Sequence, residues 1–166
     1  MRNRTLMTIV VLISSIVNGW LSAYGQEATV KTQEVQLSAE LMDLLRAEMR
    51  EIAGGIQTVA MALTTADWET VVRTSETIRA SDILEKKLSA SQRQELELGL
   101  PEEFKKLDQE FHLRAEKLGA AAATHDPEII AFQFYRLVES CAACHSAYAT
   151  SRFPGFSSET ADIHRH

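Results

Sequence analysis

The chain is poor in the residues that crosslink or break a fold. Its 166 residues include two cysteines, three prolines and seven glycines. Two cysteines are too few for a disulfide-rich scaffold. With 45% hydrophobic residues, so little proline and glycine excludes a collagen-like or low-complexity chain. Basic residues are also few, since 17 lysines and arginines face 23 acidic residues and the net charge is −6. That balance argues against binding to a nucleic-acid backbone.

The N-terminal segment has the order of a secretory signal. A short basic start precedes a mostly apolar run over 5–20, and the small residues Ala23 and Gly25 follow. This order is typical of a secretory signal peptide. We expect cleavage after Gly25, so that 1–25 are removed and the exported protein has no stable membrane insertion. An uncleaved anchor is the alternative, although the apolar run is short for a membrane span.

The rest of the chain has helical periodicity and no strand signal. Apolar residues recur at three- and four-residue spacing, and no stretch combines β-branched alternation with turn residues. The first two main helices are expected over 38–63 and 67–80, and a connection with shorter helical pieces over 81–99. The third main helix is expected to have Pro101 at its first helical position and to end in the alanine run 120–123. The fourth is expected to begin at 126 and to end at the 153–156 run.

Four amphipathic helices with short links predict an all-α, antiparallel four-helix bundle. The expected division is a signal peptide 1–25, an N-terminal extension 26–35, a bundle domain 36–156 and a flexible polar tail 157–166. Gly54 and Gly55 interrupt the first helix at about 1 kcal/mol each relative to alanine. A close neighbouring helix or bound group would offset that cost, and a tolerated weak spot is the alternative.

Both cysteines belong to one short motif on the fourth predicted helix. The run is Cys141-Ala142-Ala143-Cys144-His145, which is the attachment signature of c-type haem. Residues three and four apart share a helix face. Two thiols can therefore form thioethers to one porphyrin, and His145 comes under the iron as a ligand. We expect one covalently bound haem c.

Three other interpretations of the two cysteines have less support. A thioredoxin-like redox pair needs a βαβ setting, and none is visible. A structural zinc site needs four ligands, and a second Cys/His pair is missing. A disulfide between Cys141 and Cys144 has poor geometry inside a continuous helix.

The place of the motif resembles that of the cytochrome c′ family. Cys141-x-x-Cys144-His145 lies near the C-terminus of an exported helical chain, with Tyr148 following, and the resemblance covers roughly 36–152. It implies a haem inside the bundle near the C-terminal helix, with His145 as proximal ligand. Relatives often have a basic residue directly after the tyrosine. Here that position is Ala149, and Arg152 is the candidate substitute.

In that family a side chain of the first helix meets the other face of the iron. Met49 is the expected distal ligand, because the low-spin branch has a methionine followed at three and seven residues by aliphatics, as Ile52 and Ile56 follow here. A thioether suits haem iron and raises its potential. Met42 on the same stripe is one alternative. An open, five-coordinate iron with Leu45 or Met49 only packing nearby is the other.

Two functions follow from these ligand sets. His145 and Met49 together saturate the iron, which predicts a periplasmic electron carrier that is not an enzyme and whose acidic surface attracts basic redox partners. An open distal site instead predicts binding of small diatomic gases such as nitric oxide or carbon monoxide. A peroxidase-like enzyme ranks last, because the distal stripe offers leucine and methionine rather than an acid–base pair. The resemblance also implies a possible homodimer through the first two helices.

The remaining histidines are weaker candidates. His112 follows Phe111 on the third helix and is expected to be half-exposed, with a minor chance of contacting a propionate or water. His164 and His166 in the polar tail could bind a metal, although two tail histidines are thin support for a site.

Overall fold

Helices make up the regular structure of the residues that the computed structural model describes, 32–81 and 88–157. No strand occurs in these two ranges, so the predicted all-α class is confirmed. The expected signal peptide 1–25, the extension up to residue 31 and the tail from residue 158 lie outside them. The elements are α2 (Ala39–Thr65), α3 (Trp68–Arg79), α4 (Ala90–Gly99), α5 (Glu102–Ala122), α6 (Pro127–Tyr148) and the short 3-10 helix η2 (Pro154–Phe156).

Side-chain caps fix most helix starts where the sequence predicts them. The Ser38 hydroxyl accepts a hydrogen bond from Leu41 N at the start of α2. The carboxylates of Asp67 and Asp126 cap α3 and α6 in the same way. These bonds satisfy backbone N–H groups that have no partner inside the helix. At α4, Ser89 and Gln92 form the reciprocal capping box.

Two predicted boundaries are wrong by a few residues. Pro101 is the N-cap of α5 rather than its first helical residue, because its ψ of 146° is extended. α6 stops at Tyr148, and the 153–156 run follows as part of a separate turn that includes η2. Ala149, with φ −140° and ψ 30°, leaves the helical conformation. The α6 helix therefore ends because its C-cap turns, before the proline is reached.

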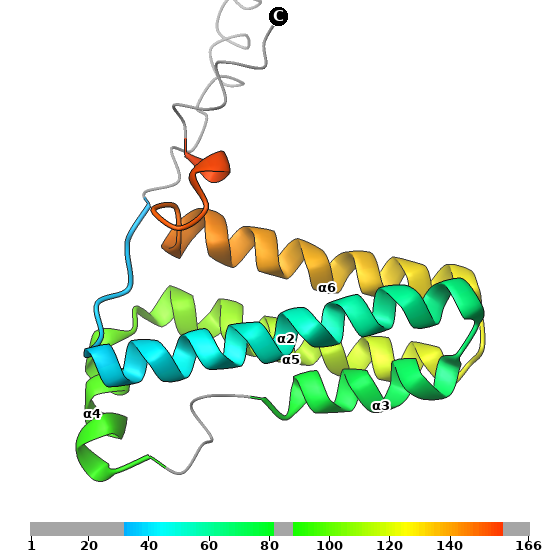
Figure 1. The fold of residues 1–166 in the computed structure, drawn as a ribbon, viewed down its shortest axis with the longest axis horizontal. Helices are drawn as coiled ribbons and strands as arrows, with labels where there is room; N and C mark the ends of the chain where they lie inside the picture. The colour runs from blue at the N-terminus through cyan, green and yellow to red at the C-terminus, as the bar shows by residue number, and fades with distance from the viewer. Residues whose placement is uncertain (1–31, 82–87, 158–166) are drawn as a thin grey trace, which may run out of the picture. The chain divides into compact units, whose positions relative to one another are not determined.

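The bundle is antiparallel, with α3 packed between α2 and α5, and α5 packed between α3 and α6 (Figure 1). The C-terminal end of α2 and the N-terminal end of α6 lie at the same end of the bundle, and the two helices diverge toward the other end, where α6 carries the cysteines (Figure 1). The short α4 lies at that second end, beside the start of α2. In the described parts of the chain, no helix is long and apolar enough to span a bilayer.

Buried apolar side chains form two separate clusters. The main core joins α2, α3, α5 and α6, and its buried members are Ile52, Val59, Ala62, Val71, Ile78, Phe111, Ala115, Leu118, Ala121, Ala122, Ile130 and Leu137. The motif-end core has the buried members Leu41, Leu88, Leu96, Leu100 and Phe104. Val35 and Leu37 of the segment before α2 pack against this second cluster. The last part of the expected extension therefore packs against the bundle.

The two glycines of α2 have different surroundings. A Cβ on Gly55 would lie 2.9 Å from Cδ1 and Cγ1 of Ile78 on α3, whereas a Cβ on Gly54 would meet nothing within 4 Å. Gly55 thus permits the close approach of α2 and α3, and the neighbouring helix explains its presence. Gly54 has no such reason and is a weak point of the helix.

Candidate haem-attachment site

The three motif residues share one face of α6 at the junction of the two cores. Cys141, Cys144 and His145 are all half-buried, and both cysteines are free. Cys141 packs against the main core, and Cys144 packs against the motif-end core. The predicted face is therefore formed, and both thiols lie where a group attached to them would contact apolar side chains.

The register between α5 and α6 places an acid opposite Cys144. The rings of Phe104 and Tyr148 meet edge to face at 5.3 Å, while Phe111 and Cys141 both belong to the main core. In an antiparallel pair, one turn from Phe104 along α5 corresponds to one turn back from Tyr148 along α6. Asp108 therefore lies level with Cys144.

Both thiols are held in their neutral form. Burial raises the pKa of Cys141. Burial, helped by the nearby charges of Asp108 and Cys141, raises the pKa of Cys144 to about 11. A neutral thiol is a poor metal ligand, and no group of three His, Cys, Asp or Glu side chains in the described ranges could hold a metal ion. Thioether formation replaces the ionisable proton, so covalent attachment would leave no charge to bury at either sulfur.

The His145 ring is suited to bind iron through a nitrogen lone pair. Burial lowers the pKa of this imidazole, which favours the neutral form. The ring of Phe153 stacks on it with centroids 4.6 Å apart and an interplanar angle of 23°. Arg152, the candidate for the basic group beside the histidine, lies instead over the Phe153 ring, 5.9 Å from its centroid.

A polar layer that the sequence interpretation missed lies near Cys144. Glu48 on α2 is 2% exposed, and the side chains of Asp108 and His112 on α5 are 16% and 12% exposed. His112 Nδ1 lies 3.2 Å from the Ile78 carbonyl oxygen, and its Nε2 lies 3.7 Å from Asp108 Oδ1. The expected half-exposed position of His112 is therefore wrong, because the ring bridges α5 to the end of α3.

The carboxyl of Asp108 leaves one hydrogen-bonding atom unused. Its Oδ2 is buried without a hydrogen-bond partner in the described structure. A buried polar atom of this kind is costly unless something else satisfies it. The signal for this layer was present in the sequence, since Glu48 lies four residues before Ile52 and Asp108 four after Phe104, both on the apolar stripes.

The inner stripe of α2 passes through Glu48 and not through Met49. Leu41, Glu48 and Ile52 are buried, whereas Met49 is 36% exposed. The expectation that Met49 lies on the buried stripe is therefore wrong. A step of 100° per residue puts Met49 about 120° around the helix from Gly55, which faces α3. Met49 thus lies on the side of α2 away from α3.

Met42 shares this side of α2. It precedes Met49 by seven residues, or nearly two turns, and is partly buried. At this end of the bundle α2 and α6 lie apart (Figure 1). Both methionines remain possible ligands from α2, and Leu45 is also partly buried.

The comparisons with known proteins agree with the motif. The family model described as Cytochrome C′ matches residues 99–149. The match spans α5, α6 and the whole Cys141–His145 run. The α2 helix with Met49 lies outside the match. No curated protein and no solved structure matched the chain.

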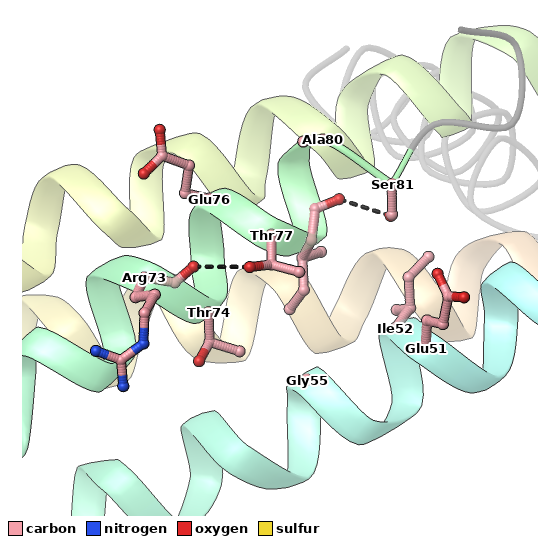
Figure 2. A pocket seen from close by; sticks show the side chains of 10 residues that line it. Glu51, Ile52, Gly55, Arg73, Thr74, Glu76, Thr77, Ala80 and Ser81 are labelled. Carbon is pink, nitrogen blue, oxygen red and sulfur yellow. Dashed lines mark hydrogen bonds between the residues drawn. The ribbon is translucent and has the colours of Figure 1, made fainter. Parts of the chain in front are cut away.

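A separate groove of about 530 Å³ lies between α2 and α3. Glu51 and Gly55 line it from α2, and Arg73 and Thr77 line it from α3 (Figure 2). The Thr77 hydroxyl donates to the Arg73 carbonyl at 3.0 Å (Figure 2), so part of its polar lining is satisfied within α3. None of the motif residues borders this groove.

Proposed function

We propose that the protein is an exported electron carrier with one haem c, which Cys141 and Cys144 attach, with His145 as the proximal and Met49 as the distal iron ligand. The observation that supports this best is the single half-buried face of α6 that holds both thiols and the imidazole. That face lies within the region that matches the cytochrome c′ family.

The side chains divide the work in a simple way. Bound haem supplies an iron that takes up and gives back one electron. His145 offers a neutral imidazole, because burial lowers its pKa. Met49 offers a soft thioether that favours the reduced iron. Two protein ligands leave no position for a substrate, which suits a carrier rather than an enzyme.

Gas binding is the second candidate, and the exposure of Met49 favours it. The Met49 side chain is 36% exposed, so burial does not direct its sulfur toward the iron. If the sulfur stays away from the iron, partly buried Leu45 lines an open apolar site. Nitric oxide or carbon monoxide would then bind there.

Covalent attachment is the first test. Haem should stay with the denatured protein through acid and organic extraction, and the mass should rise by one haem over residues 26–166. Cys141→Ala or Cys144→Ala should leave one thioether and lower the holoprotein yield, and His145→Ala should lower it sharply. Ser146→Ala, a neighbouring change outside the motif, is the control. Haem that extracts freely from the wild type would refute the proposal.

The distal ligand is tested by two methionine variants. Met49→Ala should convert a low-spin haem to high-spin, lower the reduction potential and speed carbon monoxide binding, because the sulfur ligand is lost. Helical content should stay nearly intact, since this side chain is already partly in solvent. Absorption spectra of both redox states, with and without carbon monoxide, measure the change.

Met42→Ala is the matched control and should leave the spectra unchanged. A wild type that is already high-spin would favour the gas-binding function. A spectral change in Met42→Ala instead of Met49→Ala would transfer the distal role to Met42.

Location and partners complete the proposal. Export would place the carrier in the periplasm, where its negative charge would steer basic redox partners, and no nucleic-acid or stable membrane partner is expected. A homodimer would form through α2 and α3, and the groove on that surface is where a second copy would fit. Sedimentation over a range of concentrations tests this, and a single monomeric species throughout would exclude the dimer.

A further inference from the structure

The His145 ring is oriented by packing alone within the described residues. No described side chain or backbone group hydrogen-bonds to its nitrogens, while Phe153 stacks on it at 4.6 Å. An iron-binding imidazole is usually held in one orientation by a hydrogen bond from its second nitrogen to a carboxylate, carbonyl or water. Here the stacked phenyl ring of Phe153 is the contact that restrains the orientation of the imidazole.

A tight turn after α6 brings Phe153 back over His145. Phe153 N donates to the Ala149 carbonyl at 2.9 Å, and Arg152 N donates to the same oxygen at 3.1 Å. The Arg152 guanidinium lies 5.9 Å from the Phe153 centroid. The placement of the phenyl ring is thus built into the backbone of the 149–153 turn.

The segment before α2 fastens this turn from outside. Glu34 Oε1 accepts a hydrogen bond from Ser151 N at 2.9 Å. Next to it, Gln33 N donates to the Ala147 carbonyl at 2.8 Å. Residues more than a hundred positions apart in the sequence therefore attach the turn to the segment before α2, and removing the Glu34 carboxylate would weaken that attachment without touching either ring.

We propose that Phe153 is a positioning residue that fixes the plane of the His145 imidazole toward the iron, and that Glu34 holds the turn that carries it. The inference rests on the proposed role of His145 as proximal ligand. A ring stacked at 23° blocks rotation of the imidazole about its Cβ–Cγ bond, because the rotating edge would strike the phenyl face. Removing the phenyl ring releases that rotation and lets the ligand adopt several orientations.

The test is electron paramagnetic resonance of the ferric, haem-loaded full chain. The signal positions and widths of ferric haem depend on the orientation of the axial imidazole. Phe153→Leu, which keeps an apolar side chain and loses the ring, should shift and broaden the signals. Phe153→Tyr keeps the ring and should restore the wild-type spectrum. Glu34→Ala should broaden the signals less than Phe153→Leu, because the backbone turn persists.

Phe156→Leu is the matched control, since Phe156 is 43% exposed and should leave the spectrum unchanged. A Phe153→Leu spectrum that superimposes on the wild type would overturn the inference. Should Phe153→Leu yield no folded holoprotein, the Glu34→Ala spectrum decides in its place, and a wild-type spectrum there overturns the role of the turn.

The proposed function fails separately from this inference. Absence of covalent haem, or a wild-type spectrum in His145→Ala, would refute the ligand assignment itself. Covalent haem with a changed His145→Ala spectrum and an unchanged Phe153→Leu spectrum would refute only the positioning role.

Discussion

The main core and the motif-end core are built by different means. The main core joins four helices, and several of its side chains, including Val59, Ala115 and Leu118, are fully buried. Small residues such as Gly55 let these helices approach closely. The motif-end core joins pieces of several elements, among them Leu37 before α2 and Leu96 of α4. Helix periodicity alone is enough to form the main core, whereas the motif-end core forms only where segments from several elements meet.

The motif end and the main core also differ in how well other side chains cover and hydrogen-bond their reactive and polar groups. At the motif end the two cysteines and His145 are only half-buried, Met49 is 36% exposed, and Asp108 keeps a buried oxygen without a partner. The main core shows no comparable group of chemically active side chains among its buried members. The comparison indicates that the main core supplies stability, while the motif end has apolar and polar surface that a bound haem would cover.

The largest effect that sharpens this comparison is a cavity in the main core. Leu118 has no exposed surface, so Leu118→Ala should lower the free energy of unfolding by about 2–5 kcal/mol. The haem spectrum should keep its spin state, because Leu118 lies seven residues, or about two turns, beyond Phe111 on α5 and so away from the level of Cys141. Urea unfolding followed by circular dichroism measures the loss.

The matched control for this cavity is Leu98→Ala. Leu98 is 78% exposed, so its truncation should change stability by less than about 0.5 kcal/mol. A spin-state change in Leu118→Ala would contradict the separation of the two ends.

A smaller effect should separate the two glycines of α2. Gly55→Ala places a Cβ 2.9 Å from buried Ile78, and overpacking of this kind costs about 1–3 kcal/mol. Gly54→Ala meets nothing within 4 Å and should stabilise the helix by about 0.5–1 kcal/mol. Thermal unfolding of both variants measures the difference. Equal shifts in the two melting temperatures would show that α2 and α3 do not pack through Gly55.

Much of the fold was predictable because its signals are local. Caps such as Ser38 and Asp126 lie next to the helices that they start, and apolar spacing alone gave the four main helices. The end of α6 was not predictable in this way. It depends on the conformation of Ala149 and on the contacts of Glu34 with the following turn, which connect residues far apart in the sequence.

The candidate site was likewise predictable only where its signals are local. Cys141, Cys144 and His145 share a face because of their spacing within one helix, which the sequence states directly. Whether Met49 or Glu48 occupies the buried position of α2 depends on the rotation of that helix against α3, and the contact of Gly55 with Ile78 sets this rotation. The stack of Phe153 on His145 depends on the turn after α6. The first relation leaves only an ambiguous signal, because Glu48 and Met49 lie four and three residues before Ile52 and both fit helical spacing. The second relation leaves no periodic signal.

The smallest expected effect concerns the ion pairs of Arg114 with Glu110 and Glu139, and tests whether they contribute to the stability of the protein. Arg114 on α5 donates hydrogen bonds to Glu110 Oε1 at 2.9 Å and, across to α6, to Glu139 Oε2 at 3.0 Å. The hydrogen bond from Arg114 holds the pKa of the Glu110 carboxyl below its ordinary value of 4.5. A carboxyl with a lowered folded-state pKa stabilises the protein above its ordinary pKa. That contribution is lost as the pH falls through the lowered value.

Glu110→Gln should therefore cost no more than about 1 kcal/mol at neutral pH, because the Glu110 side chain is partly in solvent and screened. The difference from the wild type should shrink below pH 4.5 and also at high salt. Glu116→Gln, which removes an exposed acid from the same helix, controls for the change in net charge. Urea unfolding of the three proteins between neutral and acidic pH measures the effect. A loss as large as that of Leu118→Ala would mean that the Glu110–Arg114 pair contributes as much to stability as a buried leucine of the main core, and the main core would then resemble the motif end more closely than its buried side chains indicate.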